Sequence, residues 1–168
     1  INVHGEAQIV MQTLRRSPWW RNFELNPYVM ATFDNFRNDI RNCTTQNVVL
    51  VYFAGHSGEG GELCFCMDKT GSVMETLGPD FVAPCIASAS KNAATRARGG
   101  TIECVVLNAC HTCALGHALL KRGVLHVVCW HREVIHAVCV CVCVCVCVCV
   151  CVWVGVGVCV CGCVFGCV

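Results

Sequence analysis

The sequence predicts an α/β/α layered domain with a mostly parallel sheet, and three observations lead to that class. Two continuous apolar, β-branched runs, Val48–Phe53 and Glu103–Leu107, are typical of strands buried on both faces of a parallel sheet. A helix-forming segment, Thr112–Lys121, follows the second run and is closed by Gly123, the residue type that commonly ends helices. A third apolar run, Leu125–Trp130, comes next, and strands alternating with helices in this order indicate a parallel sheet with crossover helices.

The N-terminal part of the chain adds two candidate helices and a short strand. Apolar residues recur at helical spacing over residues 6–16, which predicts a first helix. Residues 23–25 are a candidate strand, ended by Asn26-Pro27. Thr32 is the expected cap of a second helix, whose core-facing side carries Phe33, Phe36 and Ile40.

The middle of the chain is less clearly patterned. Residues 62–66 are predicted to form a return strand, with Cys64 and Cys66 on one face as small core residues. A helix is expected near residues 80–90. The polar, basic stretch 91–100 is then expected to be an exposed loop.

The charges place this part of the chain among ordinary globular domains. The 168 residues carry a formal net charge of +1, and every charged residue lies before residue 134. Charged residues therefore make up roughly 17% of the first 136 positions, enough for one domain with one core. The 12 basic and 11 acidic residues leave no excess of positive charge of the kind that binds nucleic acid or an anionic membrane, so neither is expected as a partner of this part of the chain.

The 19 cysteines are unevenly distributed, and eleven of them lie in the last 30 residues. Valine and cysteine alternate strictly from Cys139 to Cys151, as a translated GT dinucleotide repeat would. We therefore interpret residues 137–168 as translated microsatellite and residues 1–136 as the domain. The uncharged tail is longer than the roughly 20 residues that span a bilayer, so a membrane association would rest on the tail alone. The chain begins at Ile1, so a targeting segment upstream would not be visible and this end gives no localisation; a cytoplasmic location is the default expectation.

Two chemically competent side chains follow the predicted buried strands. His56 lies in a Gly-rich loop after the first strand, and Cys110 lies just after the second. If the strands are neighbours, both residues lie at the carboxyl edge of the sheet, where ligands and catalytic groups gather in open α/β folds. A histidine and the nearby helix N-terminus favour the nucleophilic thiolate. Backbone N–H groups of Ser57, Gly58 and Cys110 are candidates for stabilising an oxyanion. Residue spacing alone leaves a loop histidine and an inert thiol equally open.

The two segments that carry these residues resemble a known family. Phe53–Gly58 and Cys104–Cys110 are similar to the two signature segments of CHAT domains, caspase-like relatives among the clan CD cysteine peptidases. The likeness extends over roughly residues 1–134, although Ser57 stands where the family usually has glycine. The resemblance implies a caspase-like three-layer domain, incomplete at both ends, with a protein or peptide substrate. It also implies that His56 is the general base and Cys110 the nucleophile, and no metal or other cofactor is expected.

Three other interpretations use the same residues. The first is a catalytically inactive CHAT-like interaction or signalling module. The second is thiol–disulfide exchange, because Cys110 and Cys113 form a C-x-x-C motif between a strand and a helix. The third is zinc binding, although the spacing matches no common finger. Its nominal ligands are Cys110, Cys113, His117, Cys129 and His131.

Overall fold

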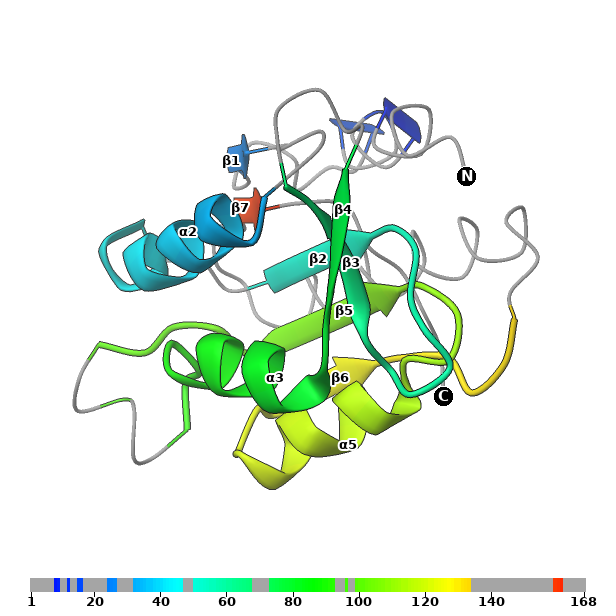
Figure 1. Cartoon of the computed structure of the whole chain (residues 1–168). Coiled ribbons are helices and arrows are strands. Elements are labelled where there is room, and N and C mark those ends of the chain that lie inside the picture. Colours follow the sequence, from blue (N-terminus) through cyan, green and yellow to red (C-terminus); the bar gives the residue numbers. More distant parts are fainter. Residues whose placement is uncertain are drawn as a thin grey trace.

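The computed structural model describes residues 8–9, 12, 15–16, 24–26, 32–46, 50–67, 73–92, 96, 99–133 and 159–161. Its named elements, labelled in Figure 1, are short strands and helices that alternate along most of the chain. They are β1 (Glu24–Asn26), α2 (Phe33–Gln46), β2 (Leu50–Ala54), β3 (Leu63–Cys66), β4 (Met74–Leu77), α3 (Pro79–Ala87), β5 (Cys104–Asn108), α5 (Cys113–Lys121), β6 (His126–Val128) and β7 (Cys159–Cys161).

The main sheet is parallel, which confirms the predicted α/β class. Its strand order is β1-β7-β2-β5-β6. β2 and β5 run side by side over their whole length, from Leu50 opposite Cys104 to Ala54 opposite Asn108. β6 continues the sheet on the far edge of β5, with Cys104 opposite His126. The two predicted buried strands are therefore neighbours, as a shared site requires.

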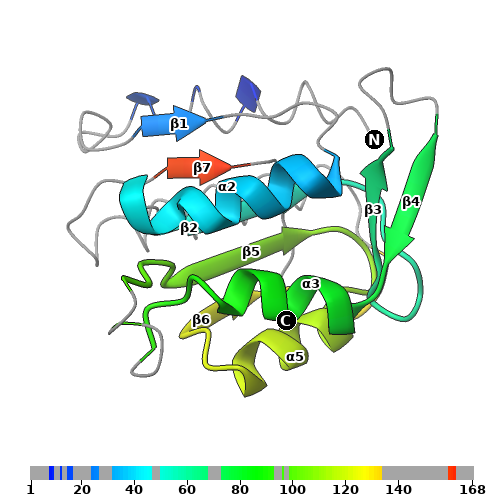
Figure 2. The same ribbon diagram turned by 60° about the vertical axis from the view of Figure 1, so that its left-hand side comes forward.

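The three named helices form one layer on the sheet. The chain passes through β1, β2, β5 and β6 in one direction across the sheet, and right-handed crossovers place successive helices on the same face in such an order. α3 packs against both α2 and α5, and Figures 1 and 2 show the three helices on one side of β2 and β5. The main sheet thus carries α2, α3 and α5 as one helix layer.

The core lies between this helix layer and the central strands. Every residue of β2 and β5 is buried, as continuous apolar strands require. Four phenylalanine rings from α2, β2 and β3 meet with centroids 5.0–6.4 Å apart, in offset and edge-on arrangements that aromatic pairs favour. These rings belong to Phe33, Phe36, Phe53 and Phe65. The cluster anchors the end of β2, immediately before the histidine loop.

Several predicted element boundaries are confirmed to within a few residues. Thr32 caps α2, because its Oγ1 accepts a hydrogen bond from the Asn35 N–H at 3.2 Å. Gly123 follows α5 with a φ of 89°, the left-handed conformation expected of a glycine just after a helix. The predicted helix at 80–90 is α3, and the third strand is β6.

The region after the histidine loop differs from the prediction. Residues 63–66 form a strand, but it pairs antiparallel with β4 in a separate two-stranded sheet, and β4 was not predicted. The prediction that Cys64 and Cys66 are core residues is wrong. Leu63 and Phe65 occupy the buried face of β3, and both cysteines are half-buried on the other face. Alternation alone does not say which face is inward, and here the larger apolar pair is buried.

The two ends of the chain are described only in part. Five residues of the predicted helix at 6–16 are described, and all five are helical; the rest lie outside the described residues. Half of the predicted 91–100 loop also lies outside them, and Arg96 is helical. From the Val/Cys segment 137–168, only β7 is described. It lies between β1 and β2, pairing Glu24 with Cys159 and Leu50 with Val160. In the described part of the chain, no helix has the length and apolar character needed to cross a membrane.

Candidate functional site

The pairing of β2 with β5 determines where the two candidate catalytic residues lie. Ala54 and Asn108 are the last paired residues of the two strands, and His56 and Cys110 each follow two residues later. The Gly55 N–H donates to the Asn108 carbonyl at 3.3 Å, which extends the pairing one step past the strands. Both loops therefore leave the same edge of the sheet at the same level. Carboxyl edges of parallel strands are where α/β folds place their ligands.

The loop that carries Cys110 is held by a buried threonine. The Thr112 side chain is fully buried, and its hydroxyl donates to the Ala109 carbonyl at 3.1 Å. The same oxygen accepts the Trp130 N–H at 3.0 Å, and the Cys113 N–H donates to the Trp130 carbonyl at 3.1 Å. The turn between β5 and α5 is thus tied to the segment after β6. This network sets the position of the Cys110 backbone.

His111, the residue after the candidate nucleophile, has an unusual backbone conformation. Its φ is 55°, the only positive φ of a non-glycine residue among those described. A left-handed conformation costs a non-glycine residue about 1–2 kcal/mol, and such strain gathers at functional sites where the surrounding structure imposes it. Here the network around Thr112 imposes it, so Cys110 lies on a sharply turned loop just ahead of α5.

The loop that carries His56 is held by backbone hydrogen bonds to β3. The Cys64 N–H donates to the His56 carbonyl at 3.0 Å, and the Gly58 N–H donates to the Glu62 carbonyl at 3.0 Å. These bonds flank an antiparallel bridge between Ser57 and Leu63. In such a bridge the amide of Ser57 points away from β3, because the bonded amides are those on either side of it.

Two contacts join the histidine loop to the cysteine loop. The Ser57 hydroxyl donates to the Cys110 carbonyl. Gly61, with a φ of 85°, packs so closely on the start of α5 that a Cβ there would lie 3.0 Å from the Ala114 Cβ and 3.1 Å from the Leu115 nitrogen. Only glycine allows both the conformation and the approach. The two loops therefore meet at Cys110 and at the first turn of α5.

The exposure of the two candidates differs. His56 is exposed, whereas Cys110 is half-buried. Both residues are therefore at least partly accessible to solvent at this edge of the sheet. Ser57, in the place where CHAT domains usually have glycine, has no positive φ and uses its hydroxyl to hold the Cys110 carbonyl. The substitution is therefore compatible with this loop geometry.

The candidate oxyanion donors are not equivalent. The N–H of Gly58 already donates to the Glu62 carbonyl, so in this structure it closes the loop and does not serve as the predicted oxyanion donor. The amide of Ser57 points away from β3 in its bridge, and the amide of Cys110 belongs to the turn ahead of α5. Ser57 and Cys110 thus remain the candidate donors.

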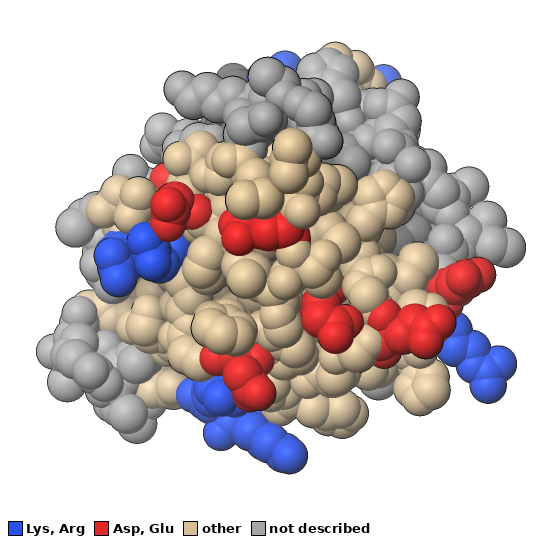
Figure 3. Space-filling view, viewed as in Figure 1, with Lys and Arg blue, Asp and Glu red and all other residues tan. Residues whose placement is uncertain are grey.

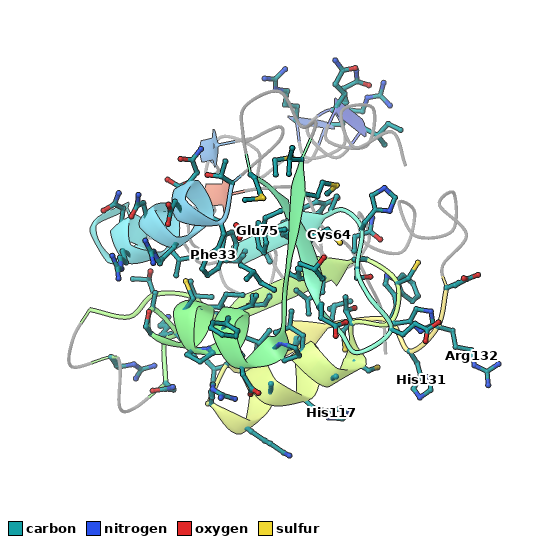
Figure 4. The ribbon with its side chains drawn as sticks, viewed as in Figure 1. Phe33, Cys64, Glu75, His117, His131 and Arg132 are labelled. Atoms are coloured by element: carbon teal, nitrogen blue, oxygen red, sulfur yellow. The ribbon has the colours of Figure 1, made fainter. Side chains whose placement is uncertain are left out.

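The nominal zinc ligands do not gather at one place. His117 lies on the outer side of α5 and His131 on the segment leaving β6, and both are exposed (Figure 4). Among the described residues, no three His, Cys, Asp or Glu side chains are close enough to hold a metal ion. The Cys113 thiol lies 3.9 Å from that of Cys129, toward the segment after β6.

Two positioning residues were missed from the sequence. Thr112 was predicted only as the start of a helix, and Gly61 only as part of a Gly-rich loop. A threonine immediately before a helix signals a cap, but Thr112 makes no side-chain cap bond and instead holds the loop before it. The role of Gly61 depends on a helix more than 50 residues away in sequence, which no local pattern reveals.

The surface around this region carries charges of both signs. In the face shown in Figure 3, acidic side chains are spread across the described surface, and basic ones lie toward its margins. Glu75 on β4 lies near the middle of this face (Figure 4).

Comparison with known proteins identifies no relative: no family model, no curated protein and no solved structure matches the chain.

Proposed function

We propose that this chain is a cysteine-type endopeptidase domain of the caspase-like CHAT class, with Cys110 as nucleophile and His56 as general base. The observation that carries the proposal is the register of β2 and β5, which places both residues two positions beyond the same paired level. The strained turn at His111 and the Ser57 contact to the Cys110 carbonyl support it. A second helix layer on the open face of the sheet, as in caspase-like folds, is part of the same proposal.

In the proposed reaction, the thiolate of Cys110 attacks the carbonyl carbon of a peptide bond, and His56 receives the thiol proton. The amides of Cys110 and Ser57 stabilise the oxyanion that forms. His56 then protonates the leaving amine, and a thioester to Cys110 remains. A water molecule, deprotonated by His56, hydrolyses this thioester and restores the thiol.

A peptide probe that reacts with nucleophilic thiols tests this assignment. The full chain would be incubated with a set of biotinylated peptidyl acyloxymethyl ketones of varied sequence, digested with trypsin and mapped. Cys110 lies in the tryptic peptide 99–121, together with Cys104 and Cys113. We expect the adduct on Cys110, and its loss in both Cys110→Ser and His56→Gln. Cys113→Ser is the matched control, because it removes a thiol from the same peptide.

The alternative is a catalytically inactive interaction or signalling module, which the exposed position of His56 would suit. A folded chain that forms no adduct with any probe would favour this alternative. An adduct that persists in His56→Gln would contradict the dyad, even if Cys110 itself is labelled.

A further inference from the structure

A second pair of thiols lies beside the candidate site. The Sγ atoms of Cys113 and Cys129 are 3.9 Å apart, and neither residue is in a disulfide. Cys113 is the first residue of α5, and Cys129 follows β6. Nothing in the proposed peptidase reaction uses either thiol. The geometry points to a redox modification site, at which a hydroperoxide converts Cys113 and Cys129 to a reversible disulfide.

The backbone around the pair brings the two residues within reach of a disulfide bond. The Cys113 N–H donates to the Trp130 carbonyl at 3.1 Å, so the backbone at Cys113 lies against the residue that follows Cys129. A disulfide needs a sulfur–sulfur distance of about 2.05 Å, and rotation of a cysteine side chain moves its sulfur by more than the remaining gap.

A glycine on α5 makes room for the second thiol. Gly116 lies one helical turn after Cys113, and a Cβ at Gly116 would be only 2.4 Å from the Cys129 sulfur. Cys129 therefore fits against the helix at the side that carries Cys113, because residues three apart share a helix face. A larger residue at position 116 would push the Cys129 sulfur out of this place.

The difference in exposure between the two thiols determines which of them reacts first with the hydroperoxide. Cys113 is half-buried, whereas Cys129 is only 3% exposed. The Cys113 thiolate attacks one oxygen of the hydroperoxide, the O–O bond breaks, and Cys113 becomes a sulfenic acid while the other oxygen leaves as water or alcohol. The thiolate of Cys129 then attacks the Cys113 sulfur and releases the second oxygen as water. Two thiols lose two electrons and two protons, and the peroxide accepts them.

The disulfide would join the start of α5 to the segment after β6, the same two regions that Thr112 and Trp130 already connect. Oxidation would therefore add a covalent link to the hydrogen bonds that hold the Cys110 loop against the segment after β6. This proposal stands independently of the peptidase function, because disulfide formation is measured without any substrate. Either proposal can fail while the other holds.

Peptide mapping tests the proposal, because trypsin separates the two cysteines. Cys113 lies in peptide 99–121, and Cys129 is the only cysteine of peptide 123–132. The reduced full chain would be treated with a small excess of hydrogen peroxide, its remaining thiols blocked, and the chain digested without reductant. We expect a species joining these two peptides, with Cys104 and Cys110 blocked. Its mass should be two hydrogen atoms below the sum of the two peptides blocked in this way, and it should be lost on treatment with dithiothreitol.

Variants assign the bond to the two residues. Cys113→Ala should abolish the joined species, and the matched control Cys110→Ala should retain it, with circular dichroism confirming that both chains fold. Gly116→Ala keeps every thiol but displaces the Cys129 sulfur, so the yield should fall. A disulfide within peptide 99–121, a joined species that survives Cys113→Ala, an unchanged yield in Gly116→Ala, or no disulfide at all would each overturn the proposal.

Discussion

The two loops at the edge of the sheet are built differently, although they start from neighbouring strands at the same level. The cysteine loop is held by the buried Thr112 hydroxyl, which donates to the Ala109 carbonyl and accepts from the Trp130 N–H. The histidine loop is exposed around His56 and is held by backbone bonds to β3 and by one close glycine contact to α5. The comparison teaches that the backbone of Cys110 is fixed by buried side-chain hydrogen bonds. His56 instead lies on an exposed loop held by three kinds of contact: the backbone bonds to β3, the Gly61 contact with α5 and the Ser57 bond to the Cys110 carbonyl.

The largest expected loss of stability comes from removing the Thr112 hydrogen bonds that hold the cysteine loop. Thr112→Val keeps the shape of the side chain but leaves the buried Ala109 carbonyl and Trp130 N–H without the hydroxyl partner. An unsatisfied buried polar group costs about 1–3 kcal/mol, so the free energy of unfolding should fall by that amount. Urea denaturation measures it. Thr112→Ser retains the hydroxyl and should lose less; equal losses in the two variants would contradict the role of the hydrogen bonds.

The next largest loss of stability is expected at Gly61, where the histidine loop packs against α5. In Gly61→Ala, the left-handed backbone costs about 1–2 kcal/mol, and the new methyl group meets Ala114 and the backbone of α5. We expect lower stability, again measured in urea, and slower probe labelling of Cys110. Gly78→Ala is the control, because a Cβ at Gly78 meets nothing within 4 Å and its φ is −72°. A Gly61→Ala chain as stable as the control would refute the close contact.

A smaller effect is expected where the two loops touch. Ser57→Ala removes the hydrogen bond to the Cys110 carbonyl and should cost about 0.5–1.5 kcal/mol, the usual net value of one such bond. It should also slow the labelling of Cys110. Ser88→Ala, which removes an exposed serine bond to the Cys85 carbonyl away from the site, should cost no more stability and should leave the labelling rate of Cys110 unchanged. If both variants label Cys110 at the wild-type rate, the Ser57 contact does not position the thiol.

The smallest effect concerns Cys85 on α3, which provides a reference thiol. Burial raises the pKa of the Cys85 thiol above its ordinary value, and the nearby Arg41 and Arg37 offset this only in part. The folded chain thus keeps this proton to higher pH than the unfolded chain does. The stability that results is present below the ordinary value and is lost as pH rises through the raised one.

The alkylation rate of Cys85 measures this shift. The thiol lies alone in tryptic peptide 70–91, so iodoacetamide modification can be followed there from about pH 7.5 to about pH 10. Modification should be slower in the folded chain than in urea, and the difference should shrink toward the alkaline end. Equal rates across the range would show that burial does not disfavour the Cys85 thiolate.

Local sequence signals predicted the parts of the fold that local physics determines. The continuous apolar strands, the Thr32 cap and the glycine after α5 all have a cause within a few residues in sequence, and each is present. The place of His56 and Cys110 at one edge also followed, because it needs only that the two strands be neighbours.

What the sequence did not reveal depends on contacts between distant segments. β4 is short and at most half-buried, so it lacks the apolar alternation that would have identified it. The buried face of β3 was misassigned because all four residues of the strand are apolar, so the sequence does not distinguish the face with Leu63 and Phe65 from the face with the two cysteines. The Val/Cys segment has strand propensity, but identical side chains at every second position specify no register, so the place of β7 between β1 and β2 could not be predicted.

The most direct test of the proposed dyad compares the reactivity of Cys110 with and without its histidine. Iodoacetamide alkylation of Cys110 near neutral pH would be followed in peptide 99–121 for the wild-type chain and for His56→Gln, with Cys85 in peptide 70–91 as the internal reference. A paired imidazole predicts slower modification of Cys110 in His56→Gln and an unchanged rate at Cys85. An unchanged rate at Cys110 would show that His56 does not activate this thiol, and the Cys–His dyad would be contradicted.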